Sequence, residues 1–198
     1  MILLKIFLSA LLVENVVLMR FLALCPFIGM STDENKSVGM GLAVTFVTVL
    51  ATLVTWPIFN YVLVLLGLEF LKLLVFILVI ASLVQLVEFY LRKAAPGLYS
   101  SMGIYLALIT TNCGILAVTL EVIDNTCAFT GEPYTFVQSI VYALGVAFGF
   151  MLSMLLLAGI RRKLKTSPIP AFLKGTPILF IASALLSIAF MGFQGLVK

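Results

Sequence analysis

The residues with the most chemistry to offer are three cysteines: Cys25 in a Leu-Cys-Pro-Phe stretch, Cys113 in a Thr-Thr-Asn-Cys stretch, and Cys127 in an acidic stretch. None shows the Cys-x-x-Cys spacing of a zinc or redox site. A cysteine in an apolar segment is, by composition alone, a small hydrophobic residue. The sequence has no histidine, which excludes a histidine base, a haem-ligating histidine and a histidine-ligated zinc ion.

Two glutamates stand in apolar surroundings. Glu14 follows Ile2 by a helical distance of about 18 Å, which predicts a place near the middle of a membrane about 30 Å thick. A lone carboxylate there costs several kcal/mol, so Glu14 must be protonated, hydrogen-bonded with the help of Asn15, or matched across helices. Both a structural strut and an ion-handling site fit this pattern. Glu88 precedes Arg92 by four residues, which fits either an interfacial salt bridge or a cation path.

Composition places these residues in a membrane protein. Hydrophobic residues make up 63 % of the chain and charged residues 10 %, against about 45–50 % and 25 % in soluble domains. The apolar runs lack the alternation of barrel strands, so we expect an all-α membrane protein. Six spans are predicted, and they account for nearly the whole chain: Ile2–Met30, Ser37–Leu68, Leu73–Leu91, Ala94–Leu120, Pro133–Ile160 and Gly175–Val197.

Basic residues predict the orientation of these spans. The Arg161–Lys165 loop, continued to Lys174, is expected in the cytoplasm, with Arg92-Lys93 and Asp33–Lys36 on the same side. The connection that carries Glu121, Asp124 and Glu132 then lies outside, as do both termini. The net charge of +4 reflects this topology and requires no nucleic-acid partner.

Six spans with both ends on one side can form two groups of three, inserted in opposite senses. We therefore predict a single membrane domain, 1–198, built from two inverted repeats at about 1–93 and 94–198, as in many transporters.

Straight first and fourth spans would put Cys25 and Cys113 on opposite faces of the membrane. The two cysteines can share a site only if both spans break into half-helices. Pro26 and Gly29 follow Cys25, and Thr and Asn residues surround Cys113, so the local sequence tolerates such breaks. Broken helices that meet at mid-membrane are typical of a buried ligand site.

Longer stretches resemble one family, which contains the A subunit of the Rnf complex and the E subunit of the sodium-pumping NADH:quinone reductase. They are Leu-Val-Glu-Asn from Leu12, Phe-Leu-Ala-Leu-Cys-Pro-Phe from Phe21, Val-Gln-Leu-Val-Glu from Val84, Ile-Thr-Thr-Asn-Cys from Ile109, Leu-Ala-Gly-Ile-Arg from Leu157, and Ala-Phe-Met-Gly-Phe-Gln-Gly from Ala189. The Cys-Pro-Phe form and the Gly-Phe-Gln-Gly-Leu-Val-Lys end look more like the Rnf member.

The resemblance implies a [2Fe–2S] cluster inside the membrane, held by four cysteines that this chain shares with a homologous subunit of inverted orientation, similar to the E subunit of the Rnf complex. Cys25 and Cys113 stand at the matching positions, and Thr111 and Asn112 are the expected neighbouring donors. An acid at the position of Glu88 is associated with cation translocation in the quinone reductase. Cys127, in the predicted outer connection, is not expected to reach the cluster.

The function predicted from these observations is that of a membrane subunit of an ion-translocating ferredoxin:NAD⁺ oxidoreductase, located in the bacterial or archaeal cell membrane. Electron transfer would be coupled to Na⁺ or H⁺ translocation, with Glu88 and Glu14 as the candidate cation path. The alternatives are the equivalent subunit of the NADH:quinone reductase, a secondary transporter without redox chemistry, and a structural anchor, which the cost of burying Glu14 disfavours.

Overall fold

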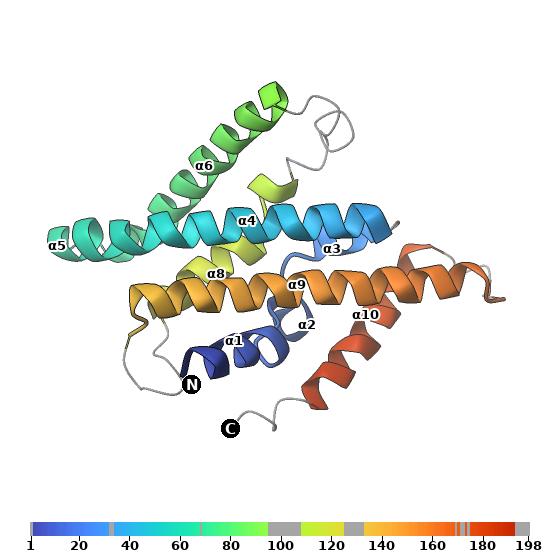
Figure 1. The fold of residues 1–198 in the computed structure, drawn as a ribbon. Coiled ribbons are helices and arrows are strands. Elements are labelled where there is room, and N and C mark those ends of the chain that lie inside the picture. The colour runs from blue at the N-terminus through green and yellow to red at the C-terminus, as the bar shows by residue number, and fades with distance from the viewer. Residues whose placement is uncertain are drawn as a thin grey trace.

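The computed structural model describes residues 2–31, 34–67, 69–94, 108–124, 133–168, 170, 173 and 175–192. Its elements are helical, and most of them lie around a central pair of long helices (Figure 1). They are α1 (Ile2–Leu12), α2 (Val16–Arg20), α3 (Leu24–Met30), α4 (Glu34–Ile58), a π-helical turn (Phe59–Leu63), α5 (Val64–Leu66), a 3₁₀ turn (Glu69–Leu71), α6 (Lys72–Ala94), α8 (Cys113–Asp124), α9 (Phe136–Lys165) and α10 (Thr176–Met191).

Helices α4 and α9 form the centre of the molecule and run antiparallel to each other (Figure 1). Both are long apolar helices. A Cβ atom on Gly41 of α4 would lie 2.7 Å from Cγ of Met151 on α9, so glycine is what permits this close approach. The start of α9 is fixed by a capping box between Thr135 and Gln138, which satisfies backbone N–H groups at the helix end.

Helix α1 packs along α9. A Cβ atom on Gly145 would lie 2.9 Å from the carbonyl oxygen of Phe7, and one on Gly149 would lie 2.8 Å from that of Leu11. These two glycines, four residues apart on α9, therefore let the α1 backbone touch the α9 backbone. The contact joins the beginning of the chain to its fifth predicted span.

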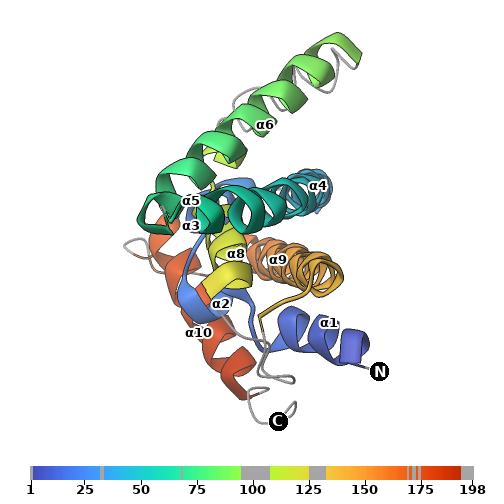
Figure 2. The ribbon, with the colours of Figure 1, turned by 90° about the vertical axis from the view of Figure 1, so that its left-hand side faces the viewer.

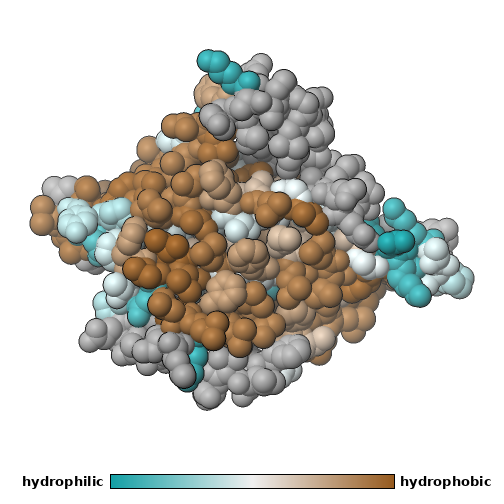
Figure 3. Space-filling view, viewed as in Figure 1, coloured by the Kyte–Doolittle hydropathy of each residue, from teal (hydrophilic) through white to brown (hydrophobic). Residues whose placement is uncertain are grey.

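Helices α6 and α10 lie on opposite sides of the α4–α9 pair (Figures 1 and 2). In the apolar part of α6 only 17 % is buried, whereas 50 % is buried in the apolar part of α4 and 56 % in that of α9. The exposed face in Figure 3 is mainly hydrophobic, and hydrophilic side chains gather where α9 ends. Such a surface suits a helix bundle surrounded by lipid or by other membrane subunits.

Three helical segments in the described part of the chain are long and apolar enough to cross a membrane: Ser37–Leu63, Lys72–Phe89 and Phe136–Lys165. Leu3–Leu12 and Thr176–Met191 are apolar but shorter. The second, third and fifth predicted spans are thus present as long helices. Within the second, Pro57 precedes the π-helical turn, as expected where a proline removes a backbone donor. The six-span count stays a prediction.

The first predicted span is broken, as expected, but its breaks lie elsewhere. The chain leaves the helical conformation at residues 13–15 and again at 21–23, before Cys25 rather than after it. Pro26 belongs to the first turn of α3, where a missing N–H costs no helical hydrogen bond. The prediction that Pro26 and Gly29 form the break was therefore wrong.

The fourth predicted span breaks at Thr111 and Asn112, as expected, and continues as α8. Its predicted end at Leu120 was wrong: α8 runs to Asp124 and buries Glu121. The basic stretch Arg161–Lys165 was predicted as a loop, but it forms the last turns of α9. Residues 95–107, Cys127, Glu132 and the C-terminal residues after Gly192 lie outside the described residues.

Candidate functional site

Cys25 and Cys113 belong to two short helices that begin close to each other. Cys25 is the second residue of α3 and Cys113 is the first residue of α8. The backbone N–H of Ala23, two residues before Cys25, donates a hydrogen bond to Sγ of Cys113 over 3.0 Å. Both cysteines are free and exposed. The breaks therefore bring the beginning of α3 into contact with the sulfur of Cys113, at the beginning of α8. We call this place the cysteine junction.

Unusual backbone conformations and one tight contact build the cysteine junction. Phe21 and Ala23 have φ angles of 53° and 58°, in the left-handed region that residues with side chains rarely adopt. On the other side, Oδ1 of Asn112 accepts a hydrogen bond from the N–H of Gly114 over 2.9 Å and so caps α8. A Cβ atom on Gly114 would lie 3.0 Å from Cβ of Ala23, so glycine lets the two breaks approach closely.

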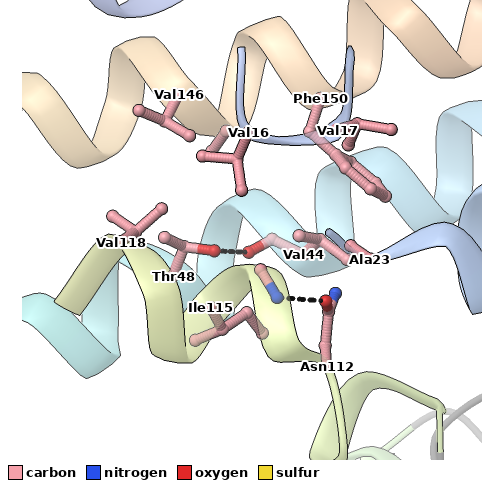
Figure 4. A pocket seen from close by; sticks show the side chains of 12 residues that line it. Val16, Val17, Ala23, Val44, Thr48, Asn112, Ile115, Val118, Val146 and Phe150 are labelled. Atoms are coloured by element: carbon pink, nitrogen blue, oxygen red, sulfur yellow. Dashed lines mark hydrogen bonds between the residues drawn. The ribbon is translucent and has the colours of Figure 1, made fainter. Parts of the chain in front are cut away.

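The cysteine junction lies midway along the central helices. A small cavity behind it, about 20 Å³ in volume, is lined by Ala23 and Asn112 and by residues near the middle of α4 and α9, including Thr48 and Phe150 (Figure 4). The Nδ2 atom of Asn112 is buried and has no hydrogen-bond partner among the described residues. A donor held in this way is available to a water molecule or to a bound group.

Asn15 explains the first break in the chain. Its side chain is fully buried, and Oδ1 accepts hydrogen bonds from the N–H groups of Val17 and Leu18 at the start of α2. Its Nδ2 donates to the carbonyl oxygen of Gly149 over 2.9 Å and to Oγ of Ser153 over 2.6 Å. One amide thus caps the helix that follows the break and ties the break to the middle of α9.

Glu14 is matched across helices. Its carboxyl accepts a hydrogen bond from the hydroxyl of Tyr142 on α9, with 2.6 Å between the oxygens. The same hydroxyl lies 3.0 Å from Oε2 of Glu121 on α8, and Glu121 forms a salt bridge with Arg20 at the end of α2. We call Glu14, Tyr142, Glu121 and Arg20 the acid–tyrosine cluster. Glu14 is therefore not a lone charge. Its contact across helices is one of the three arrangements that the sequence allowed.

Our sequence analysis missed two members of the acid–tyrosine cluster. Glu121 was expected in an outer connection, but only 6 % of it is exposed. The signal was present, because the apolar run continues through Val122 and Ile123 after this residue. Tyr142 is an ordinary residue of a long apolar helix, and no spacing within α9 marks it. Only the packing of α1 and α8 against α9 gives it a role.

The remaining predicted site residues are placed less completely. Thr111 is exposed beside Cys113. Glu88 lies near the end of α6, a helix that packs on α4 and α8. The side chain of Arg92 is outside the described residues, so the expected Glu88–Arg92 pair stays a prediction. Among the described residues, no group of three or more His, Cys, Asp or Glu side chains could hold a metal ion.

Comparison with known proteins gives a consistent result over the whole chain. A family described as "Rnf-Nqr subunit, membrane protein" matches residues 3–197. The A subunit of the ion-translocating oxidoreductase complex of Syntrophotalea carbinolica is 50 % identical over 195 residues, which cover 98 % of this chain and 97 % of that protein.

Two further relatives carry more specific names. The A subunit of the Na⁺-translocating ferredoxin:NAD⁺ oxidoreductase complex of Acetobacterium woodii is 46 % identical over 99 % of this chain and 98 % of that protein. The A subunit of the proton-translocating ferredoxin:NAD⁺ oxidoreductase complex of Clostridium ljungdahlii is 44 % identical over 98 % of this chain and 97 % of that protein. The chain is thus similar to relatives named for different ions.

Proposed function

The chain belongs to the Rnf-Nqr family of membrane protein subunits, and on this basis we propose that it acts as the A subunit of an ion-translocating ferredoxin:NAD⁺ oxidoreductase complex in a bacterial membrane. The observation that carries the proposal is the similarity over nearly the whole length to three proteins named as the A subunit of an ion-translocating complex, two of which are named ferredoxin:NAD⁺ oxidoreductases. Within the complex, the chain would contribute to the activity and have none by itself.

We propose that Cys25 and Cys113 hold half of a [2Fe–2S] cluster, which would supply one-electron redox chemistry. The residues fit such a group: both thiols are exposed, both stand at helix N-termini where the helix dipole favours negative charge, and the sulfur of Cys113 already accepts an N–H bond from Ala23. The spare N–H of Asn112 and the hydroxyl of Thr111 are the proposed neighbouring donors.

A cluster of this type takes four protein ligands, so a second polypeptide must supply the other two. We propose a homologous subunit inserted in the opposite sense. The internal arrangement of this chain supports an inverted-repeat design, because α4 and α9 run antiparallel and α6 and α10 lie on opposite sides of them (Figures 1 and 2). The exposure of both cysteines supports a site at the interface between subunits.

The proposed orientation puts the end of α9 in the cytoplasm, because Arg161, Arg162, Lys163 and Lys165 follow one another there. Both termini would then lie outside. A reporter enzyme fused after Lys198 should be active only outside the cytoplasm, and one inserted after Lys165 only inside. Activity of both reporters on the same side would contradict the six-span arrangement.

We propose that Glu14 and Glu88 lie on the path of the translocated cation. For Glu14, the support comes from the number of protons available for its hydrogen bonds. The hydroxyl of Tyr142 has one proton but lies within hydrogen-bond distance of carboxyl oxygens of both Glu14 and Glu121. The hydroxyl can donate its single proton to only one of the two carboxyl groups. The other carboxyl makes a favourable hydrogen bond to the hydroxyl oxygen only when that carboxyl carries a proton of its own. Because Arg20 pairs with Glu121, Glu14 is the proposed site where a proton binds or Na⁺ replaces it.

The test of the cluster proposal compares the full-length chain produced alone with the same chain co-produced with its homologous partner subunit. Iron content and the absorption and EPR spectra of the reduced protein are the measurements. We expect little or no iron in the chain alone and one [2Fe–2S] cluster per heterodimer. A stoichiometric cluster in the isolated monomer would contradict the shared site. An iron-free complex that still couples ferredoxin oxidation to NAD⁺ reduction would contradict the cluster itself.

A further inference from the structure

A pocket opens where α9 ends and α10 begins. It has a volume of about 380 Å³, and its lining comes from the last turns of α9, the following segment and the first turns of α10: Arg161, Leu164, Lys165, Ser167, Gly175, Ile178 and Leu179. This volume lies within the range of ligand-binding pockets. Neither the cysteine junction nor the acid–tyrosine cluster contributes a residue to it.

One wall of this pocket is polar and positively charged. Lys165 and Ser167 are exposed, and Arg161 is partly buried beside them. No described acidic residue lines the pocket to neutralise the two cationic side chains. Gly175 precedes α10 and gives it no side-chain cap, so the N–H groups of the first turn, apart from the missing one of Pro177, add to the positive potential at this end of the helix. This wall is suited to a phosphate group, which accepts hydrogen bonds and carries negative charge.

The remaining wall is apolar. Leu179 is buried, and Leu164 and Ile178 are partly buried. The basic residues stand at the end of a 30-residue helix that is otherwise apolar, and α10 is itself an apolar helix. A ligand in this pocket would therefore meet positive charge at the membrane surface and hydrocarbon immediately below it.

We propose that the pocket binds the headgroup of an anionic phospholipid, with the phosphate on Lys165, Ser167 and Arg161 and the first carbons of an acyl chain on Ile178 and Leu179. A soluble phosphate ester shares the charge but leaves the apolar wall uncovered, so the lipid satisfies both walls. The inference rests on the proposed membrane placement of α9 and α10 and is independent of the proposed redox role.

The position of Arg161 gives the bound lipid a structural consequence. Its Nη1 atom donates to the carbonyl oxygen of Ile28 over 3.0 Å and to Oγ of Ser31 over 3.2 Å. It thereby holds the C-terminal end of α3, the helix that begins at the cysteine junction. A phosphate on the remaining N–H groups of this guanidinium would fix its plane and so favour the observed position of α3.

The test uses the full-length chain in detergent and native mass spectrometry with added phosphatidylglycerol, phosphatidylcholine or glycerol 3-phosphate. Lys165→Gln removes one charge from the pocket, and Lys163→Gln removes one from the same helical turn outside it. We expect phosphatidylglycerol to bind about fivefold more weakly to Lys165→Gln and within about twofold of the wild-type affinity to Lys163→Gln. We also expect phosphatidylcholine to bind weakly and glycerol 3-phosphate to leave bound lipid in place.

Three results would overturn the proposal. Equal losses in the two lysine variants would mean that the lipid responds to general surface charge. Displacement by millimolar glycerol 3-phosphate would identify a soluble phosphate ester as the ligand. Equal binding of both lipids would remove the role of the headgroup charge. A circular dichroism spectrum of each variant confirms that its fold is retained, and iron content in the complex keeps this test separate from that of the cluster.

Discussion

The cysteine junction and the acid–tyrosine cluster are both made by breaks in helices, yet they differ in how complete they are. At the cysteine junction the thiols are exposed, and one donor of Asn112 has no partner among the described residues. In the acid–tyrosine cluster Glu14, Tyr142, Glu121 and Arg20 form a continuous chain of contacts within this polypeptide. The cysteine junction presents its thiols to a partner, whereas the charged groups of the acid–tyrosine cluster contact one another within the chain.

This difference teaches what each place requires from the rest of a complex. A partner must complete the cysteine junction, because two thiols cannot bind a cluster that takes four ligands. The acid–tyrosine cluster requires only that α1, α8 and α9 pack correctly. Substitutions at the cysteine junction should therefore affect cofactor content with little change in the stability of the subunit. Substitutions around the acid–tyrosine cluster should lower the stability of the subunit with little change in cofactor content.

The largest effect is expected at the cysteine junction. Cys25→Ser or Cys113→Ser should each remove the cluster signal from the complex entirely, because a missing thiolate leaves the iron without a ligand. The measurement is iron content with EPR of the reduced complex. Cys127→Ser is the control, with the signal unchanged. A normal cluster in Cys25→Ser would mean that the cysteine junction is not half of a metal site.

The second effect concerns the packing that supports the acid–tyrosine cluster. Gly149→Ala puts a methyl group 2.8 Å from the carbonyl oxygen of Leu11, so α1 must shift away from α9. We expect a loss of about 1–3 kcal/mol in the free energy of unfolding, measured by titration of the subunit with SDS. Gly159→Ala, on the same helix, is the control, because among the described residues no atom beyond the neighbouring helix backbone lies within 4 Å of the added carbon. Equal losses in the two variants would contradict the close contact.

A smaller loss is expected when the link between the two carboxyls is removed. Tyr142→Phe deletes the hydroxyl that contacts Glu14 and Glu121, and we expect about 1–2 kcal/mol of destabilisation from buried acceptors left unpaired. Tyr61→Phe is the matched control, because Tyr61 is 73 % exposed. SDS titration gives the stability, and the cation dependence of turnover in the complex tests the ion path. A Tyr142→Phe protein equal to wild type in both measurements would show that the acid–tyrosine cluster has no such role.

The smallest effect on stability is expected at Glu88, which belongs to neither place. Glu88→Gln should change the free energy of unfolding by about 0–1 kcal/mol, as for an interfacial ion pair. If Glu88 binds the cation, the same substitution should weaken the cation dependence of turnover and leave the spectrum of the iron centre intact. Arg92→Gln is the control for simple pairing. Wild-type cation dependence in Glu88→Gln would remove this residue from the ion path.

The sequence predicted the fold where the physical signal is strong. Long apolar runs give long helices at α4, α6 and α9. The need for Cys25 and Cys113 to share a site required two broken helices. Both breaks exist, and the one at Thr111 and Asn112 lies where the polar residues indicated. The first break was misplaced because proline and glycine are treated as helix breakers, whereas Pro26 lies in a first turn that tolerates it.

The acid–tyrosine cluster shows where sequence reasoning ends. Glu14 was identifiable because a carboxyl in an apolar run is costly. Its partner Tyr142 is 128 residues away in the chain, and nothing local distinguishes it from other aromatic residues. Likewise, Asn15 was recognised only as a neighbour of Glu14, although its bonds to Gly149 and Ser153 make it the centre of the first break. These pairings depend on tertiary contact, which periodicity does not encode.

The short length of α1 has a consequence for the order in which the protein is made. A helix of 11 residues extends about 16 Å, roughly half of the hydrocarbon thickness. The two groups that accept hydrogen bonds from Nδ2 of Asn15, just after this helix, are 134 and 138 residues away from it in the chain. At about 5–20 residues per second, the ribosome needs roughly 7–27 s to add those 134 residues. During that time the Nδ2 group of Asn15 lacks these two acceptors, and only the synthesis of α9 supplies them.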